Sequence, residues 1–441
     1  MSTVVVSTYN VVNSPQVGGH FWVYMQYVQG LRLLGCDVYW LERFKRTSDD
    51  RRDGERLRRF LDQMRRFGLE GRVLLYDQPA GDPGAFEFLT ASPGEAGAIF
   101  RRADLVLNFH YAVSPELLKR FRRTAFVDID PGLLQFWVAH GQIRLTPHQY
   151  SFTIGETVGR ADARFPDCGL DWIHIRPAVC LEWWPFAEVP DTGRFTTVSN
   201  WWGGEGRGEF ITDGKGLLYE NNKRYSFLRF VDLPRLTPSE LELALFLGDD
   251  ETPFDESKRC LGREVGPVDP TYDGIEMYRY TGDHVDRRIL EEYGWHVRPS
   301  HEVASTPEDY QRYVAGSRGE FSCAKPSCMR FQNAWISDRS LCYLASGRPV
   351  VLQDTGPSAF LPNGPGMYRF TTAEEAVEAL ERVNAEYERH RRAAREIAEA
   401  YFDAKQTAET ILNAVSVRRA SVVVAGPQPD PGARRAAAGP P

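Results

Sequence analysis

The residues best suited to chemistry lie between Glu320 and Gly356. Ser337 is a natural N-cap, because its hydroxyl can accept a hydrogen bond from a free backbone N–H of the following turn. The helix that it opens carries Asp338, Arg339 and Ser340 in its first turn. Free N–H groups at a helix N-terminus, hydroxyls and a guanidinium together can bind a diphosphate. A structural interpretation stands beside this one, in which Ser337 only caps the helix and Arg339 only pairs with an acid.

Two loops are expected to complete this site. Val350-Val351-Leu352 is typical of a buried strand, and Asp354-Thr355-Gly356 follows it directly. In an open parallel sheet, ligands bind at the carboxyl ends of the strands and against helix N-termini. We therefore assign Asp354, Thr355 and Gly356 to the same candidate diphosphate site. Lys325, in the loop after the predicted short strand 320–323, is a further candidate cation.

The run SDRSLCYLASGRPVVLQDTG resembles the nucleotide-sugar half of bacterial glycosyltransferases with the two-domain GT-B fold. It is similar to a group of such proteins with a WFSDRS–YLASGRPVV signature, with Ile336 here in place of the phenylalanine. The resemblance extends to about Val415. It implies an α/β fold of two Rossmann-like domains, whose parallel sheets face a cleft and whose C-terminal helices cross back onto the first domain.

One position departs from the large retaining GT-B families. These families place a glutamate five residues before the glycine of an A-x-G-x-P-V segment, and this chain has Cys342 there. The pair of glutamates that binds ribose and sugar in those enzymes therefore cannot be carried over to this chain.

Gly18-Gly19-His20 forms a loop between the predicted strand Val4–Ser7 and an amphipathic helix over Phe21–Leu34. With the strand 36–40 that follows, this is a βαβ unit, which implies a parallel sheet. The loop resembles the glycine pair that lets the GT-B backbone approach the donor diphosphate. Inverting members often place their base histidine in this loop, and an unperturbed histidine suits a general base at neutral pH. Alternatively, His20 only donates a hydrogen bond at the helix start.

Asp128 and Asp130 are the rival candidates for the catalytic base. They lie at the carboxyl end of the predicted strand 125–130, and such strand ends face the cleft by topology. Their alternative role is to cap the next helix and turn. The Asp-x-Asp spacing also resembles the metal motif of the other glycosyltransferase fold, GT-A, but the strand order does not fit that fold. We predict no metal and no cofactor, with the nucleotide sugar as a substrate.

The second domain is expected to begin with the strand 195–199 and the loop 200–204. By resemblance, the loop after this strand and a nearby cation meet the donor phosphates. Trp201 and Lys223 are the candidates that this implies. Trp201 could equally be a packing residue between the domains.

The length of 441 residues allows two ordinary domains. We place an acceptor domain at 1–185, a linker at 186–193 and a nucleotide-sugar domain at 194–416. The tail 417–441 is expected to be disordered, because Pro, Gly, Ala and a few Arg supply too little apolar surface to fold.

Composition narrows the functional classes. Hydrophobic residues make up 42% of the chain and charged residues 26%, which is typical of a soluble globular protein, and the net charge of −7 argues against nucleic-acid binding. No apolar run approaches a membrane span, so we expect a cytoplasmic protein. The charged segment 43–67 could form a basic helix on an anionic membrane, but its interspersed acids favour a solvated helix face.

The resemblance implies a metal-independent glycosyltransferase of the hexosyltransferase type. Its donor is a UDP-, GDP- or dTDP-sugar, and its acceptor is a hydroxyl or amine on a small molecule or another acceptor. Two alternatives remain open, because fold does not fix function. One is a GT-B nucleotide-sugar epimerase, and the other is a non-catalytic protein that binds nucleotides or sugars.

Overall fold

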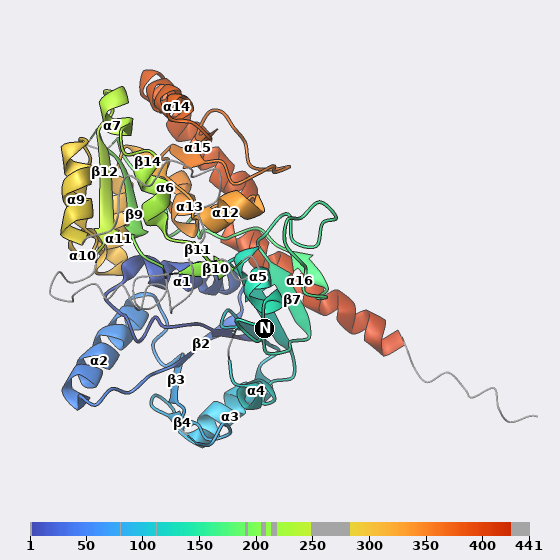
Figure 1. Cartoon of the computed structure of the whole chain (residues 1–441). Helices are drawn as coiled ribbons and strands as arrows, with labels where there is room; N and C mark the ends of the chain where they lie inside the picture. Colours follow the sequence, from blue (N-terminus) through green and yellow to red (C-terminus); the bar gives the residue numbers. More distant parts are fainter. Residues whose placement is uncertain are drawn as a thin grey trace, which may run out of the picture.

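The computed structural model describes residues 2–79, 81–111, 113–189, 193–203, 209–212, 218–247 and 283–424. These residues form two α/β halves, each built on its own mainly parallel sheet (Figure 1). The strands of the two sheets come from residues 3–174 and 195–370. The expected linker at 186–193 falls between these ranges, although its residues 190–192 lie outside the described part.

The first sheet has the order β4-β3-β2-β1-β5-β6-β7-β8. Every neighbouring pair is parallel except β3 and β4. Its strands are β1 (Thr3–Ser7), β2 (Asp37–Arg43), β3 (Val73–Asp77), β4 (Glu87–Phe88), β5 (Leu105–Asn108), β6 (Thr124–Asp128), β7 (Tyr150–Thr153) and β8 (Trp172–His174). The helices of this half are α1 (Gly18–Leu33), α2 (Asp50–Arg66), α3 (Pro93–Arg102), α4 (Pro115–Leu118) and α5 (Leu133–Ala139).

The second sheet has the order β13-β12-β9-β14-β15-β16, with all neighbours parallel. Its strands are β9 (Phe195–Asn200), β12 (Leu241–Phe246), β13 (His296–Pro299), β14 (Gly319–Ser322), β15 (Val350–Gln353) and β16 (Met367–Phe370). The helices here are α6 (Lys223–Leu228), α7 (Leu233–Leu236), α9 (Asp283–Glu292), α10 (His301–Ala304), α11 (Pro307–Gly316), α12 (Pro326–Phe331) and α13 (Asp338–Ala345). A separate antiparallel pair joins β10 (Phe210–Thr212) to β11 (Leu218–Glu220).

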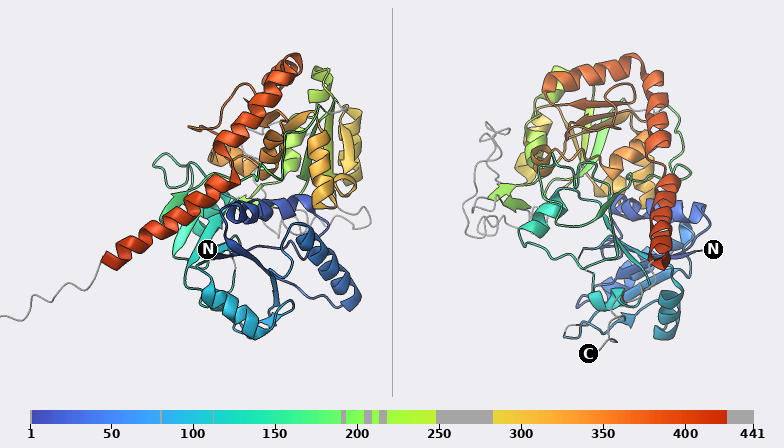
Figure 2. Two further views of the ribbon diagram at one scale, coloured as in Figure 1. Left: turned by 180° about the vertical axis from the view of Figure 1, so that it is seen from behind. Right: turned by 90° about the vertical axis from the view of Figure 1, so that its right-hand side faces the viewer.

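The C-terminal helices return to the first half, as predicted. They are α14 (Ala373–Ala385), α15 (Tyr387–Tyr401) and α16 (Ala404–Val424). The backbone N–H of Val179 donates to the carbonyl of Phe402 at 2.8 Å, and that of Ala404 donates to the carbonyl of Val179 at 3.0 Å. These bonds attach the start of α16 to the first half, along which the helix then runs (Figure 2).

Helix α16 continues past residue 416, where we expected disorder to begin. It reaches Val424, and the next helix breakers in the sequence are Gly426 and Pro427. The helix therefore includes residues 417–424 of the expected tail, and disorder beyond them stays a prediction. Residues 425–441 lie outside the described part of the chain.

Helix α1 lies between the two halves (Figure 1). We expected an amphipathic helix, but its burial continues around the helix and includes the polar Gln26 and Gln29. Both amides are hydrogen-bonded, as buried polar groups must be: Gln26 Oε1 accepts from the N–H of Cys180 at 2.8 Å, and Gln29 Nε2 donates to the carbonyl of Phe67 at 3.0 Å. The extra burial follows from the contacts of α1 with α11 and α16 as well as with its own sheet.

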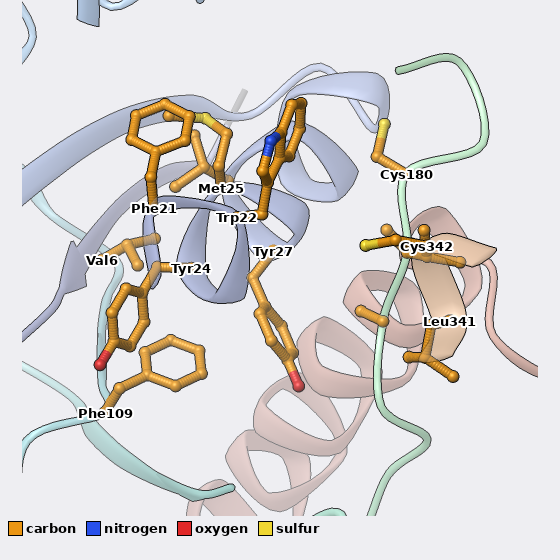
Figure 3. Packing of buried hydrophobic residues seen from close by; sticks show 14 of the residues in the cluster. Val6, Phe21, Trp22, Tyr24, Met25, Tyr27, Phe109, Cys180, Leu341 and Cys342 are labelled. Carbon is orange, nitrogen blue, oxygen red and sulfur yellow. The ribbon is translucent and has the colours of Figure 1, made fainter. Parts of the chain in front are cut away.

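Aromatic side chains fill the space around α1. Tyr24 and Tyr27 are directed toward Phe109, with ring centroids 5.5 Å and 4.8 Å from it (Figure 3). On the second domain, the Sγ of Cys342 in α13 accepts a hydrogen bond from Gln26 Nε2 at 3.6 Å. One apolar core therefore extends from the first sheet through α1 to α13.

Candidate functional site

A cleft with a volume of about 630 Å³ lies between the two halves and is lined by residues from both. Of the residues assigned to a site from the sequence, those that line it are Gly19, His20, Asp130, Lys223, Lys325, Ser337, Asp338 and Arg339. Those outside its lining are Gly18, Asp128, Trp201, Ser340, Asp354, Thr355 and Gly356. The cleft thus brings together the start of α1, the loop after β6, the start of α6 and the start of α13.

Helix α13 begins as the sequence predicted, with Ser337 Oγ accepting from the backbone N–H of Arg339 at 3.3 Å. Arg339 itself is only 7% exposed. Its Nε donates to Glu320 Oε1 at 2.5 Å, and its other two nitrogens donate to the Val198 carbonyl at 2.8 Å and to Ser322 Oγ at 2.6 Å. The ion pair that was one of the two interpretations is therefore present. Arg339 fixes the start of α13 against β9 and β14 and contributes positive charge to the cleft wall.

Three residues of the loop after β15 form hydrogen bonds that stabilise the segment leading into α13. The Asp354 carboxylate pairs with Arg369 and accepts from the N–H of Gly356. Thr355 Oγ1 donates to the carbonyl of Trp335 at 2.7 Å, and the Thr355 carbonyl accepts from the N–H of Ala334 at 3.0 Å. These three candidates hold the segment that leads into α13. Contact between them and a donor stays a prediction.

Gly356 is required for a backbone reason. Its φ is +119°, and a Cβ at this position would lie 2.7 Å from the carbonyl oxygen of Gln332. Only glycine adopts such a conformation without strain. Ser340, the other assigned residue near the start of α13, is buried.

Two lysines line the cleft wall formed by the second half, and they differ in whether the ammonium is paired with a carboxylate. Lys223 is the first residue of α6, and among the described residues no acid lies within ion-pair distance of its ammonium. Burial, together with the nearby Arg339 and Lys325 charges, lowers its pKa to about 7. Lys325 Nζ lies 3.0 Å from both carboxylate oxygens of Glu209. Burial opposes its charge, but the carboxylates of Glu209 and Asp130 outweigh burial and raise the pKa of Lys325.

His20 lies in the first turn of α1, and its Nε2 is 2.7 Å from the carbonyl oxygen of Tyr9. A carbonyl can only accept, so Nε2 carries the proton and the basic lone pair is on Nδ1. Burial lowers the pKa of His20 below its usual value, with partial opposition from the Tyr9 carbonyl and Asp338. His20 is therefore a neutral imidazole at neutral pH, which is the form that a general base requires.

The two rival aspartates differ in access to the cleft. Asp128 is 1% exposed, and its Oδ2 accepts from Gln135 Nε2 at 2.7 Å and from Thr153 Oγ1 at 2.9 Å. Its Oδ1 accepts from the backbone N–H of Asp130, so Asp128 stabilises the turn below the cleft. Burial raises the pKa of the Asp128 carboxyl to about 7. Asp130 lines the cleft and is the member of the pair that can reach a ligand.

Gly18 and Trp201 serve packing in this structure. A Cβ on Gly18 would lie 2.1 Å from the carbonyl oxygen of Thr306, so the glycine lets α1 approach the segment before α11. Trp201 is fully buried in the core of the second domain, stacked on Phe227, and its Nε1 donates to Asp286 Oδ2 at 2.8 Å. Its position is therefore within that domain rather than between the two domains.

Sequence reasoning missed several residues that line the cleft. Trp202, one residue after the assigned Trp201, lines it, and so does Phe246, which ends β12 and is 59% exposed. The rule that strand ends face the cleft could have found Phe246. Glu209 carried no such signal, because it pairs with a lysine more than a hundred positions away.

Within the described residues, no group of three or more His, Cys, Asp or Glu side chains could hold a metal ion. Metal independence stays a prediction. No helix in the part of the chain that is described is both long and apolar enough to cross a membrane.

The predicted basic helix is α2, and its apolar side is already occupied. Phe60 and Met64 are buried, while Arg51 and Arg65 pair with acids on the solvent side. This arrangement favours a solvated helix face over membrane contact.

No protein-family model matches the chain, and neither does any curated protein. Several solved structures do match the chain. An alpha-glucosyltransferase in complex with UDP and a 13-mer DNA containing an A:G mismatch superposes with a TM-score of 0.55 at 11% identity, over 94% of this chain and 100% of that one. Anabaena Alr3699/HepE in complex with UDP and glucose superposes with a TM-score of 0.54 at 11% identity, over 95% of this chain and 100% of that one. The chain has the GT-B fold. At this level of identity the likeness establishes the GT-B fold alone. The reaction therefore has to be inferred from the residues of the cleft.

Proposed function

We propose that the protein is a glycosyltransferase that uses a nucleotide-sugar donor. The observation that carries this proposal is the state of Lys223 in the cleft wall. Lys223 is half-buried, and a partly desolvated ammonium without an ion-pair partner among the described residues is costly. A bound anion removes that cost. The N-terminus of α13 lines the same cleft, and its dipole adds to the attraction for an anion. A diphosphate suits this combination.

The reaction needs a base on the other side of the cleft. The acceptor oxygen forms a bond to the anomeric carbon, the bond from that carbon to the diphosphate oxygen breaks, and its electron pair leaves with the diphosphate. The acceptor proton passes to a base, for which His20 Nδ1 and the Asp130 carboxylate are the two candidates that line the cleft. Lys223, Lys325 and the start of α13 would stabilise the charge that develops on the leaving diphosphate.

Two more specific proposals concern the class of donor and the class of acceptor. Both neighbouring structures were solved with UDP, so we propose a UDP-sugar as the first donor to test, with GDP- and dTDP-sugars beside it. One neighbour is a complex with DNA. The net charge of −7 supports a small-molecule acceptor for this chain instead.

Calorimetric titration with UDP, GDP and dTDP, followed by an assay of nucleoside diphosphate release from the matching sugars, tests the proposal. A transferase releases the diphosphate only when an acceptor is present, an epimerase converts the donor sugar, and a binding protein does neither. Lys223→Met should weaken binding of the diphosphate, whereas Lys405→Met, at an exposed lysine of α16, should not. Equal binding by wild type and both variants would refute the donor site.

A further inference from the structure

Four aromatic side chains stand in a continuous row on the first domain: Tyr9, His110, Tyr111 and Trp137. The rings of Tyr9 and His110 are stacked, with centroids 4.4 Å apart and an interplanar angle of 24°. His110 and Tyr111 follow at 5.8 Å with an interplanar angle of 60°, and Tyr111 and Trp137 at 6.4 Å with an angle of 57°, so these two pairs are tilted. All four are partly exposed, whereas Tyr24, Tyr27 and Phe109 beneath them are buried in the core.

The sheet topology places this row beside the cleft. Strands β1, β5 and β6 are neighbours, and Tyr9, His110 and Asp130 each lie two residues beyond the ends of these strands, Ser7, Asn108 and Asp128. Parallel strands bring their carboxyl ends to one edge, so the row begins next to the cleft-lining Asp130.

Both ends of the row adjoin residues of the cleft wall. Asn10, which follows Tyr9, lines the cleft. Leu133 lines it at the start of α5, and Trp137 is one turn further along the same helix face. Figure 1 shows α5 at the junction of the two halves.

The imidazole of His110 is uncharged at neutral pH. Burial, with Lys45 and Arg43 nearby, lowers the pKa of His110 to about 4. Lys45 Nζ lies 5.5 Å from the Tyr9 ring centroid, and His110 stacks on the same ring, so Tyr9 supports the row from one end. Trp137 at the opposite end has the largest ring and is the position at which ligand contact is best tested.

Resting on the glycosyltransferase function proposed above, we propose that this row is the acceptor subsite and that the acceptor carries a ring with an apolar face, either a sugar or an aromatic ring. Partly exposed aromatic side chains bind the apolar faces of such rings, with little loss of side-chain entropy. A ring that lies along the row places its hydroxyl groups at the cleft edge formed by Asn10, Asp130 and Leu133. The row therefore orients the acceptor, while the cleft wall holds the base.

Saturation-transfer NMR on the full chain tests this with three probes at millimolar concentration: 4-nitrophenyl β-D-glucoside, methyl β-D-glucoside and 4-nitrophenol. We expect transfer from the protein to the ring protons of the first probe. Binding of methyl glucoside alone would identify the sugar ring as the recognised group, and binding of nitrophenol alone would identify the aromatic ring. Absence of transfer to all three probes would overturn the proposal.

Variants at two tryptophans localise the binding. Trp137→Ala should weaken the affinity for the binding probe about tenfold, and Trp137→Phe should retain most of it, because it keeps an aromatic face. The matched control is Trp172→Ala, because Trp172 of β8 is also partly exposed and packs on the same apolar cluster as Trp137. An equal loss in the Trp172 variant would show that the effect is structural and would overturn the assignment of the row.

Titration of the same samples with UDP separates this proposal from the one on which it rests. Ring binding needs no nucleotide, and Trp137→Ala should leave UDP affinity within about twofold. Failure of wild type to bind any nucleoside diphosphate would refute the proposed donor. Loss of UDP binding together with probe binding in Trp137→Ala would contradict a separate acceptor subsite.

Discussion

Replacing Lys223 with methionine should remove most of the pH dependence of nucleoside diphosphate binding. The pKa of Lys223 is lowered to about 7 in the free protein, chiefly by burial. A bound diphosphate favours the ammonium form and should return the pKa toward the usual lysine value of about 10.4. The pKa is then higher in the complex than in the free protein, so binding takes up a proton and weakens as the pH rises.

The size of the effect follows from the same two pKa values. Between about pH 7.5 and about pH 9, the fraction of free protein with a charged Lys223 falls about 25-fold, and the affinity should fall by the same factor. At about pH 8, binding should take up about 0.9 proton. This range lies above the second pKa of a terminal phosphate, about 6, so the ligand itself contributes little.

Calorimetry in two buffers of different ionisation enthalpy measures both the affinity and the number of protons taken up on binding. Lys223→Met should bind more weakly at neutral pH and show a nearly flat profile, while Lys405→Met should follow wild type. The melting temperature of Lys223→Met should stay equal or rise, because the substitution removes a half-buried charge without an ion-pair partner among the described residues. Less than a threefold change in wild-type affinity across the range, with no proton uptake, would refute the assignment of Lys223 to the diphosphate.

Three further predictions concern neighbouring residues. Arg339→Ala should lower the melting temperature strongly, since breaking a buried ion pair costs about 3–5 kcal/mol, and thermal denaturation measures this. His20→Ala and Asp130→Asn test the base: the variant that removes it should lose about 10²–10⁴ in turnover with nucleotide affinity within a few-fold, and equal turnover in both would place the base elsewhere. Gly18→Ala should destabilise the protein through its clash with the Thr306 carbonyl, whereas Gly54→Ala, in open space on α2, should not.

Much of the fold was predictable because local patterns and global architecture agree. The apolar strands before Ser7, Asn200 and Gln353 end in polar or glycine-containing loops, and the helix after Ser337 has its cap and its apolar face in register. Such signals depend on neighbours in the sequence, and the structure reproduces them within a few residues. The GT-B architecture itself came from a resemblance in one segment rather than from these patterns.

The site was less predictable, because its charges are set by partners far away in the sequence. Arg339 was assigned to a diphosphate, but its guanidinium is held by Glu320, Val198 and Ser322 from two different strands. The Lys325 ammonium is paired with Glu209, while Lys223, with the same residue type and a similar setting, is not paired with any described acid. No spacing in the sequence distinguishes these two lysines.

Contacts of helix α1 with the second domain fix the positions of the two cleft walls relative to each other. Its first turn carries Gly19 and His20 into the cleft, while Trp22 Nε1, on the next turn, donates to the carbonyl of Pro307 at 3.0 Å in the second domain. Gln26, one turn further, contacts Cys342 of α13. The position of His20 relative to the start of α13 is therefore fixed by direct contacts of α1 with the second domain. The loop of Asp130 is held instead by the first sheet and by contacts that include the hydrogen bond, 2.7 Å, from Asn333 Nδ2 to the Pro131 carbonyl. The two candidate bases thus respond to different interdomain contacts, so a change at Asn333 should displace Asp130 and leave His20 in place.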